Sequence, residues 1–272
     1  MNTLLCVDDF HYSFNEILTG DKIFERCCVI LTTFQKFSYH QGIEHTENRM
    51  LFFENVENMI TTLNSFQFVP TVALYLDHVL LFKDLVLPHL KREIVLVCHN
   101  GDLSFEDYDI CNSMFIKKVY SQNLNIIHEK ARALPIGLRN RMFTQNNIEK
   151  INLLRKQPLD KIKKKVFICM DFNSHPVRKE LKYYLDWNDI PYYSDLEYRD
   201  YLVKMNECEF VLAPQGNGID THRFWEAIYL KCIPIVIENE SNKNFYQNLR
   251  KSGYFFLSFK TPNDIFTYLD TL

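Results

Sequence analysis

The sequence predicts an α/β protein built from two Rossmann-like lobes. Strand-like apolar runs alternate with helical segments from Val166 to the end of the chain, which is typical of a parallel sheet. The apolar run IVLVC at Ile94 to Cys98 indicates a buried strand of a second sheet. Between the halves, residues 144–165 are polar and basic, which predicts a linker. We assign residues 1–145 to an N-terminal lobe, 146–165 to the linker and 166–272 to a C-terminal lobe.

Composition narrows the class of protein. The chain has 272 residues, 47% of them hydrophobic, enough for a core in each of two small domains. A net charge of −3 gives no global basic character, so we expect no nucleic-acid partner. The eight cysteines include no C-x-x-C pair, which favours buried free thiols in a reducing compartment. No run approaches the ~18 apolar residues of a membrane span and no targeting segment is evident, which predicts a cytoplasmic protein.

In the first half, short apolar runs predict strands and a helical rhythm predicts one helix. The stretch from Val72 to Leu90 covers a strand or helix plus a packing helix, and the pattern does not separate these. The expected strands are Leu4–Val7, Cys27–Thr32, Ile94–Cys98, Lys117–Tyr120 and Ala133–Ile136, and the expected helix is Phe52–Leu63.

The second half has a more regular alternation. Strands are expected at Val166–Met170, Ile190–Tyr193, Phe210–Ala213, Ile233–Ile237 and Tyr254–Leu257. Helices are expected at Pro176–Leu185, at Tyr198–Met205, from Asp220 or Thr221 to about Leu230, around Phe245–Leu249 and from Asp264.

The segment from Phe210 to Ile237 carries the clearest chemical signal. Its first strand ends at Pro214, and the glycines that follow, Gly216 and Gly218, are expected to adopt positive φ so that the backbone can approach a ligand. Asp220 and Thr221 are N-cap candidates, and Asp220, Arg223 and Glu226 recur every third residue of the helix. Such a strand–loop–helix unit supports phosphate binding, with Arg223 as a bidentate donor and Glu226 accepting ribose hydroxyls. The alternative is a surface ion pair between Arg223 and Glu226.

The segment APQGNGIDTHRFWEAIYLKCIPIVI resembles the C-terminal signature of exostosin-like glycosyltransferases, which consists of the patterns P-x-G, D-x-x-R-x-x-E-A-I and C-I-P-V/I in this order. Four upstream motifs are similar to companion motifs of short members of this group, including ones from large DNA viruses: HNGD (99–102), SQN (121–123), LPIGL (134–138) and FNSHPVR (172–178). The resemblance covers roughly residues 93 to 250.

This resemblance implies a GT-B-like fold, in which a cleft separates an acceptor lobe from a donor lobe. It implies transfer of a sugar from a nucleotide diphosphate donor to a glycan hydroxyl with inversion, UDP-sugars being the family-based expectation and UDP-xylose one possibility. No metal site is expected, and Mg²⁺ or Mn²⁺ can assist through the phosphates. The expected donor-site residues are Asn173, Arg178, Gln215, Gly216, Asn217, Gly218, Asp220, Arg223 and Glu226, with Ser174 beside Asn173. Gln215 stands where relatives often carry a basic residue.

The HNGD motif follows a predicted buried strand and offers a catalytic base. Asp102 or His99 could take the proton from the acceptor hydroxyl. The alternative is an Asn-Gly-Asp turn in which Asp102 caps a helix, and both interpretations can hold. Two other functions stay open: another phosphate-ester activity, such as an epimerase or hydrolase, and a non-catalytic nucleotide- or glycan-binding protein.

Overall fold

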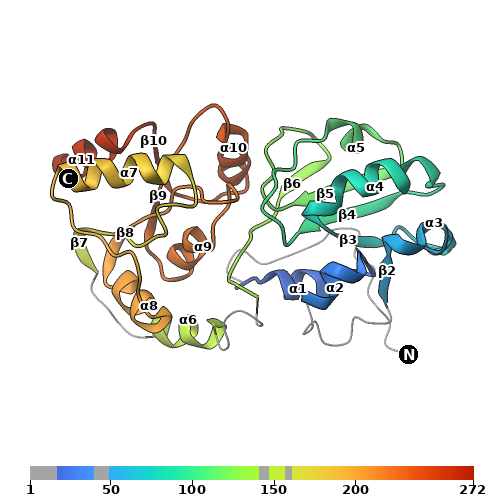
Figure 1. Cartoon of the computed structure of the whole chain (residues 1–272), viewed down its shortest axis with the longest axis horizontal. Helices are drawn as coiled ribbons and strands as arrows, with labels where there is room; N and C mark the ends of the chain where they lie inside the picture. Colours follow the sequence, from blue (N-terminus) through green and yellow to red (C-terminus); the bar gives the residue numbers. More distant parts are fainter. Residues whose placement is uncertain (1–16, 40–48, 141–146, 157–160) are drawn as a thin grey trace. The chain divides into compact units, whose positions relative to one another are not determined.

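The computed structural model describes residues 17–39, 49–140, 147–156 and 161–272 (Figure 1). The chain divides into two compact units, Met1–Ile136 with Asn140–Gln145, and Gly137–Arg139 with Asn146–Leu272. Each unit contains its own parallel β-sheet. The predicted α/β class is therefore confirmed, and both sheets are compatible with Rossmann-like lobes. The strand expected at Leu4–Val7 lies outside the described residues.

The first unit is built on a six-stranded sheet with the order β2-β1-β3-β4-β5-β6, in which all neighbours are parallel. The order reverses direction between β1 and β3, as in doubly wound folds. Parallel strands place all their carboxyl ends on one edge, so the loops that follow them meet there. The strands are β1 (Val29–Thr32), β2 (Met50–Phe52), β3 (Thr71–Tyr75), β4 (Ile94–His99), β5 (Ile116–Ser121) and β6 (Ala131–Ala133).

Short helices connect these strands. A buried cluster joins Ile23 and Phe24 of the first helix to Ile30, Ala73 and Val95 of the sheet, so helix α1 is fixed by apolar packing. The helices are α1 (Gly20–Glu25), α2 (Phe34–Tyr39), α3 (Val56–Ser65), α4 (Val79–Leu85) and α5 (Tyr108–Asn112), with 3₁₀ turns η2 (Phe53–Asn55), η3 (Leu76–His78) and η4 (Leu87–His89).

The second unit is built on a four-stranded parallel sheet with the order β10-β9-β8-β7. Beyond the end of β7, Tyr193 pairs with Cys169 in a single parallel bridge. The strands are β7 (Ile162–Phe167), β8 (Cys208–Leu212), β9 (Ile233–Ile237) and β10 (Leu257–Phe259).

Helices cover both faces of this second sheet (Figure 1). Leu181 and Leu185 of α7 and Ile265 and Leu269 of α11 pack on one face, while α8 and α9 pack against β8 and against each other. The helices are α6 (Asn147–Lys156), α7 (Pro176–Trp187), α8 (Tyr198–Asn206), α9 (His222–Tyr229), α10 (Lys243–Lys251) and α11 (Pro262–Thr271).

Several boundaries differ from the sequence-based expectation. The predicted linker contains α6, which packs against α8 and α9 within the second unit, and β7 begins at Ile162 rather than Val166. The strand expected at Ile190–Tyr193 is reduced to the bridge at Tyr193. The last strand is β10 at Leu257–Phe259, whereas Tyr254–Leu257 was expected. Tertiary packing, and not local composition, decides the structure of these lysine-rich and aromatic segments.

Candidate functional site

The loop between β8 and α9 is organised by side-chain hydrogen bonds. Thr221 is the N-cap of α9, with its Oγ1 accepting from Phe224 N at 3.4 Å. Asp220 has a different role, since its two carboxylate oxygens accept from Trp225 Nε1 at 2.8 and 2.9 Å, and Oδ1 also accepts from Thr221 N at 2.9 Å. The expectation that Asp220 faces a ligand is therefore replaced by a buried contact that fixes the entry into α9.

The two loop glycines do not have the predicted backbone conformation. Among the described glycines, positive φ occurs at Gly137 and Gly253 and not at Gly216 or Gly218. Gly216 is required for another reason: a Cβ added there would lie 2.7 Å from Nη2 of Arg178. Its N–H donates to Gly218 O at 3.0 Å, which closes the tip of the loop.

Arg178 joins two loops at the carboxyl edge of the sheet. Its guanidinium donates to Gln215 O at 2.9 Å, Pro214 O at 3.1 Å, Asp171 O at 3.2 Å and Ser174 Oγ at 2.9 Å. Burial, together with the charge of a neighbouring arginine, lowers its pKa to about 10. Most of the donors expected to clasp a diphosphate are therefore engaged within the protein, so Arg178 holds the loops that follow β7 and β8.

Gln215 is also engaged within the protein. Its Oε1 accepts from Asn242 Nδ2 at 2.6 Å, and its Nε2 lies 2.7 Å from His175 Nε2. His175 is the N-cap of α7 and Asn242 is completely buried. By contrast, the side chains of Asn173 and Asn217, both expected at the donor site, are exposed. The sequence analysis did not single out His175 or Asn242. For His175 a signal was present, because this residue directly precedes Pro176, and proline is favoured as the first residue of a helix.

Arg223 has unused donors at this edge. It lies in the first turn of α9, and its Nε and Nη1 atoms are buried without a hydrogen-bond partner among the described residues. Its charge is felt by Arg178, whose pKa it lowers, and by Glu226, where it opposes the rise in pKa. An arginine in this state next to a helix N-terminus is suited to bind an anion.

Glu226 is buried one turn further along α9. Its Oε1 accepts from the hydroxyl of Tyr198 at 3.1 Å, and its Oε2 accepts from the hydroxyl of Tyr201 at 2.8 Å. Burial raises the pKa of Glu226, while the bond from Tyr201 and the charge of Arg223 oppose the rise. The surface ion pair that the i, i+3 spacing allowed is absent, because the carboxylate is buried against two tyrosines that the sequence did not indicate.

In the first unit, the HNGD motif follows β4. His99 is completely buried, with Nε2 2.9 Å from Pro135 O and Nδ1 3.2 Å from Asn100 Oδ1. Both ring nitrogens are thus occupied, which removes His99 as an accessible base. Asp102 is exposed on the loop, and the N-cap of α5 is Asp107 rather than Asp102.

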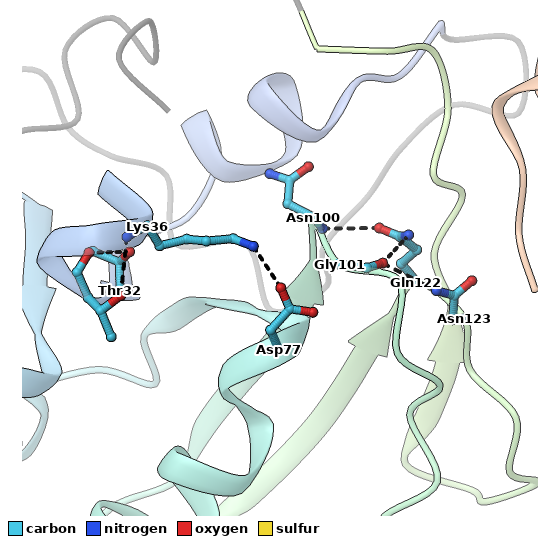
Figure 2. Close-up of polar contacts among 8 residues, drawn as sticks. Thr32, Lys36, Asp77, Asn100, Gly101, Gln122 and Asn123 are labelled. Carbon is cyan, nitrogen blue, oxygen red and sulfur yellow. Dashed lines mark hydrogen bonds and ion pairs between the residues drawn. The ribbon is translucent and has the colours of Figure 1, made fainter. Parts of the chain in front are cut away.

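The SQN motif fixes the shape of this loop, as Figure 2 shows. Gln122 Oε1 accepts from Asn100 N at 3.0 Å and Gln122 Nε2 donates to Gly101 O at 2.7 Å. Asn123 Nδ2 lies 3.2–3.3 Å from the carbonyl oxygens of residues 101, 102 and 103. Asn100 and Asn123 both adopt positive φ, 58° and 50°, which asparagine tolerates. The HNGD and SQN motifs therefore form one structural element.

An ion pair lies close to this loop at the carboxyl edge of the first sheet. Lys36 of α2 donates to Asp77 Oδ2 at 2.6 Å, and Gly101 lies so close that an added Cβ would be 2.6 Å from Asp77 Oδ1 (Figure 2). Nothing in the sequence pattern connects Lys36 with Asp77, because 41 positions separate them.

Within the described ranges, no three histidine, cysteine, aspartate or glutamate side chains are grouped so as to hold a metal ion. No described helix has the length and hydropathy needed to cross a membrane. No protein-family model matches the chain, and no curated protein is significantly similar to it.

Proposed function

We propose that this protein is a glycosyltransferase that moves a sugar from a nucleoside diphosphate donor to a hydroxyl of a glycan. The observation that carries the proposal is the state of Arg223, whose Nε and Nη1 are buried without partners in the described structure. Leaving buried donors unpaired is unfavourable, and a diphosphate at the start of α9 would satisfy them. The resemblance of residues 213–237 to the exostosin-like signature supports the same ligand.

The site residues of the second unit then have specific roles. Arg223 and the first-turn amides of α9 neutralise the diphosphate, which eases its departure with the electron pair of the broken glycosidic bond. Glu226, oriented by Tyr198 and Tyr201, has further lone pairs for the ribose hydroxyls. Arg178 keeps the loop backbone in place.

The finer features of the proposal follow the family resemblance. The fold would be GT-B-like, with the donor bound by the second unit and the acceptor by the first. Transfer would invert the anomeric centre, and UDP-sugars are the first donors to test, UDP-xylose among them. The proposed chemistry needs no protein-bound metal, and Mg²⁺ or Mn²⁺ could assist by binding the phosphates. A cytoplasmic location is supported by the free thiols of the described cysteines, most of them buried.

Isothermal titration calorimetry tests the donor site. Wild-type protein is titrated with UDP, GDP, ADP and CDP and their sugar conjugates, with and without Mn²⁺. We expect one nucleoside diphosphate to bind selectively and Arg223→Met to weaken that binding at least tenfold. Arg199→Met, at an exposed arginine of α8, is the matched control and should bind like the wild type. The proposal would be refuted if the wild type bound none of the nucleotides, or if Arg223→Met bound a nucleotide as tightly as the wild type does.

A second candidate is a non-catalytic nucleotide- or glycan-binding protein. It is favoured by Gln215, a neutral side chain fully engaged with His175 and Asn242, and by the burial of His99. The two candidates differ in turnover. A transferase releases free nucleoside diphosphate faster when a panel of acceptor sugars is added, whereas a binding protein shows nucleotide affinity and no release.

A further inference from the structure

The first unit has a polar site where its strand order reverses. Ligands of open α/β sheets bind beyond the carboxyl ends of the strands at such a reversal, which here lies between β1 and β3. Lys36 comes from α2, which follows β1, and Asp77 comes from η3, which follows β3. Their side chains meet at 2.6 Å and remain partly exposed, 28% and 37% respectively. The pair is therefore placed at the edge of the sheet where a ligand is expected, and water reaches it.

The loop after β4 completes this site. Gly101 touches the carboxylate of Asp77, since an added Cβ would be 2.6 Å from Oδ1. The preceding residue, Asn100, is held by a bond from its backbone N–H to Gln122 and by Asn140 Nδ2, which donates to its Oδ1 at 3.1 Å. Its own Nδ2 is buried and has no hydrogen-bond partner in the described part of the chain. Asn100 therefore has an amide donor that no described protein group uses, and it directly precedes the glycine that lies against Asp77.

The chemistry of these groups fits the hydroxyls of a sugar. A carboxylate accepts hydrogen bonds from hydroxyls, while an ammonium and an amide N–H donate to them. A phosphate would be repelled by Asp77, and a lone carboxylate beside a lysine does not suit a divalent cation. Phe34, two residues before Lys36, is 58% exposed and stacks on Phe52 at 4.3 Å between ring centroids, which adds an apolar surface at the same end of α2.

Resting on the proposed transferase function, we propose that Lys36, Asp77 and Asn100 bind the acceptor sugar and that Asp77 is the general base. The Asp77 carboxylate takes the proton of the acceptor hydroxyl while that oxygen bonds to the anomeric carbon of the donor. The bond from this carbon to the diphosphate breaks, and the electron pair leaves with the diphosphate. Lys36 positions the carboxylate, and Asn100 orients the acceptor. Asp77 thereby replaces Asp102 and His99 in the role that the HNGD motif suggested.

Saturation-transfer NMR on the full chain tests acceptor binding without any nucleotide. The probes are free glucose, galactose, mannose, xylose and N-acetylglucosamine, at concentrations on the order of tens of millimolar, where a millimolar Kd gives near saturation. We expect a signal from at least one sugar in the wild type and in Asp84→Asn, the control at an exposed aspartate of α4, and its loss in Asp77→Asn. Absence of signal from all five sugars, or a signal that survives Asp77→Asn, overturns the acceptor site.

Because Asp77→Asn also breaks an ion pair, the double variant Lys36→Asp, Asp77→Lys serves as the folding control. It restores the opposite charges in reversed positions, so we expect its melting temperature to be close to that of the wild type and its sugar signal to be lost. Sugar binding at wild-type strength by this reversed pair would show that Asp77 does not contact the ligand and would overturn the acceptor site.

Transfer kinetics test the base. With the donor found by calorimetry, Asp77→Asn is expected to lower kcat by about 10²–10⁴-fold and to leave the Kd of the nucleotide unchanged. If Asp102→Asn lowered kcat by this factor while Asp77→Asn kept full activity, the role of general base would return to Asp102. The two proposals can fail separately. Sugar binding through Asp77 without nucleotide binding would refute the transferase and keep the sugar site. Nucleotide binding without a sugar signal would refute the sugar site and keep the transferase.

Discussion

Gly216 lies against the guanidinium of Arg178, so that a Cβ on Gly216 would be 2.7 Å from Nη2 and 3.0 Å from Cζ. The guanidinium cannot move away easily, because it is bonded to carbonyl oxygens of the loops after β7 and β8 and to Ser174. Gly216→Ala should therefore lower the free energy of unfolding by about 1–3 kcal/mol, as overpacking does. Urea unfolding followed by circular dichroism measures this.

The same contact predicts a coupling between the two positions. In an Arg178→Met background the clash is relieved, so Gly216→Ala should cost less than it does in the wild type. A double-mutant cycle gives the coupling energy. Equal costs in both backgrounds would show that Gly216 is needed for a reason unrelated to Arg178.

Arg223→Met should stabilise the unliganded protein. The variant removes two buried donors that have no described partner, which should raise the free energy of unfolding by about 1–2 kcal/mol, and the methionine retains most of the apolar stem. Thermal unfolding without nucleotide measures the change, and nucleotide should raise the melting temperature of the wild type more than that of the variant. A destabilised Arg223→Met would instead assign the arginine a structural role.

Glu226 should make stability depend on pH. Burial raises its pKa in the folded protein, so the folded state binds a proton more tightly than the unfolded chain, in which the pKa of glutamate is about 4.3. The contribution of Glu226 to the free energy of unfolding is therefore complete below that pH and is lost as the pH rises through the raised pKa. Glu226→Gln should gain stability relative to the wild type over this range.

Urea titrations of the wild type and Glu226→Gln at a series of pH values from acid to neutral test this. Glu180→Gln, at an exposed glutamate of α7, controls for the substitution itself. A difference between Glu226→Gln and the wild type that stays constant across the series contradicts the raised pKa.

Asn123→Gly should loosen the loop after β4. Glycine adopts the φ of 50° found at this position, so the substitution removes the side chain without adding backbone strain. It leaves three loop carbonyls without the Nδ2 donor, which should cost about 1–3 kcal/mol. Hydrogen exchange of the amides of residues 101–105 should accelerate. Unchanged exchange there would show that Gln122 alone holds the loop.

The sequence was most informative where a strand is buried on both faces. Ile94–Cys98 and Ile233–Ile237 were placed almost to the residue, since continuous apolar runs mark central strands of parallel sheets. It was least informative from 146 to 165, where lysines and asparagines suggested a linker and the chain instead forms α6 and the start of β7. Packing of α6 on α8 and α9 supplies the stability that its composition does not indicate.

At the candidate donor site, the sequence identified residues but not their partners. Arg178, Gln215 and Glu226 are buried at the expected edge, yet each is engaged by groups that lie far from it in sequence. Asn242 is 27 positions from Gln215, and Tyr201 is 25 positions from Glu226. Spacing along a helix reports neighbours three or four residues away and carries no information about such pairs.

The buried contact between Asp220 and Trp225 places a natural fluorophore at the loop between β8 and α9. The chain has two tryptophans. Trp187 is 88% exposed, whereas Trp225 is buried, with its indole N–H bonded to Asp220 at the entry into α9. A Trp187→Phe variant would thus carry a single fluorophore two residues from Arg223, and its emission would report any rearrangement of that loop without a label.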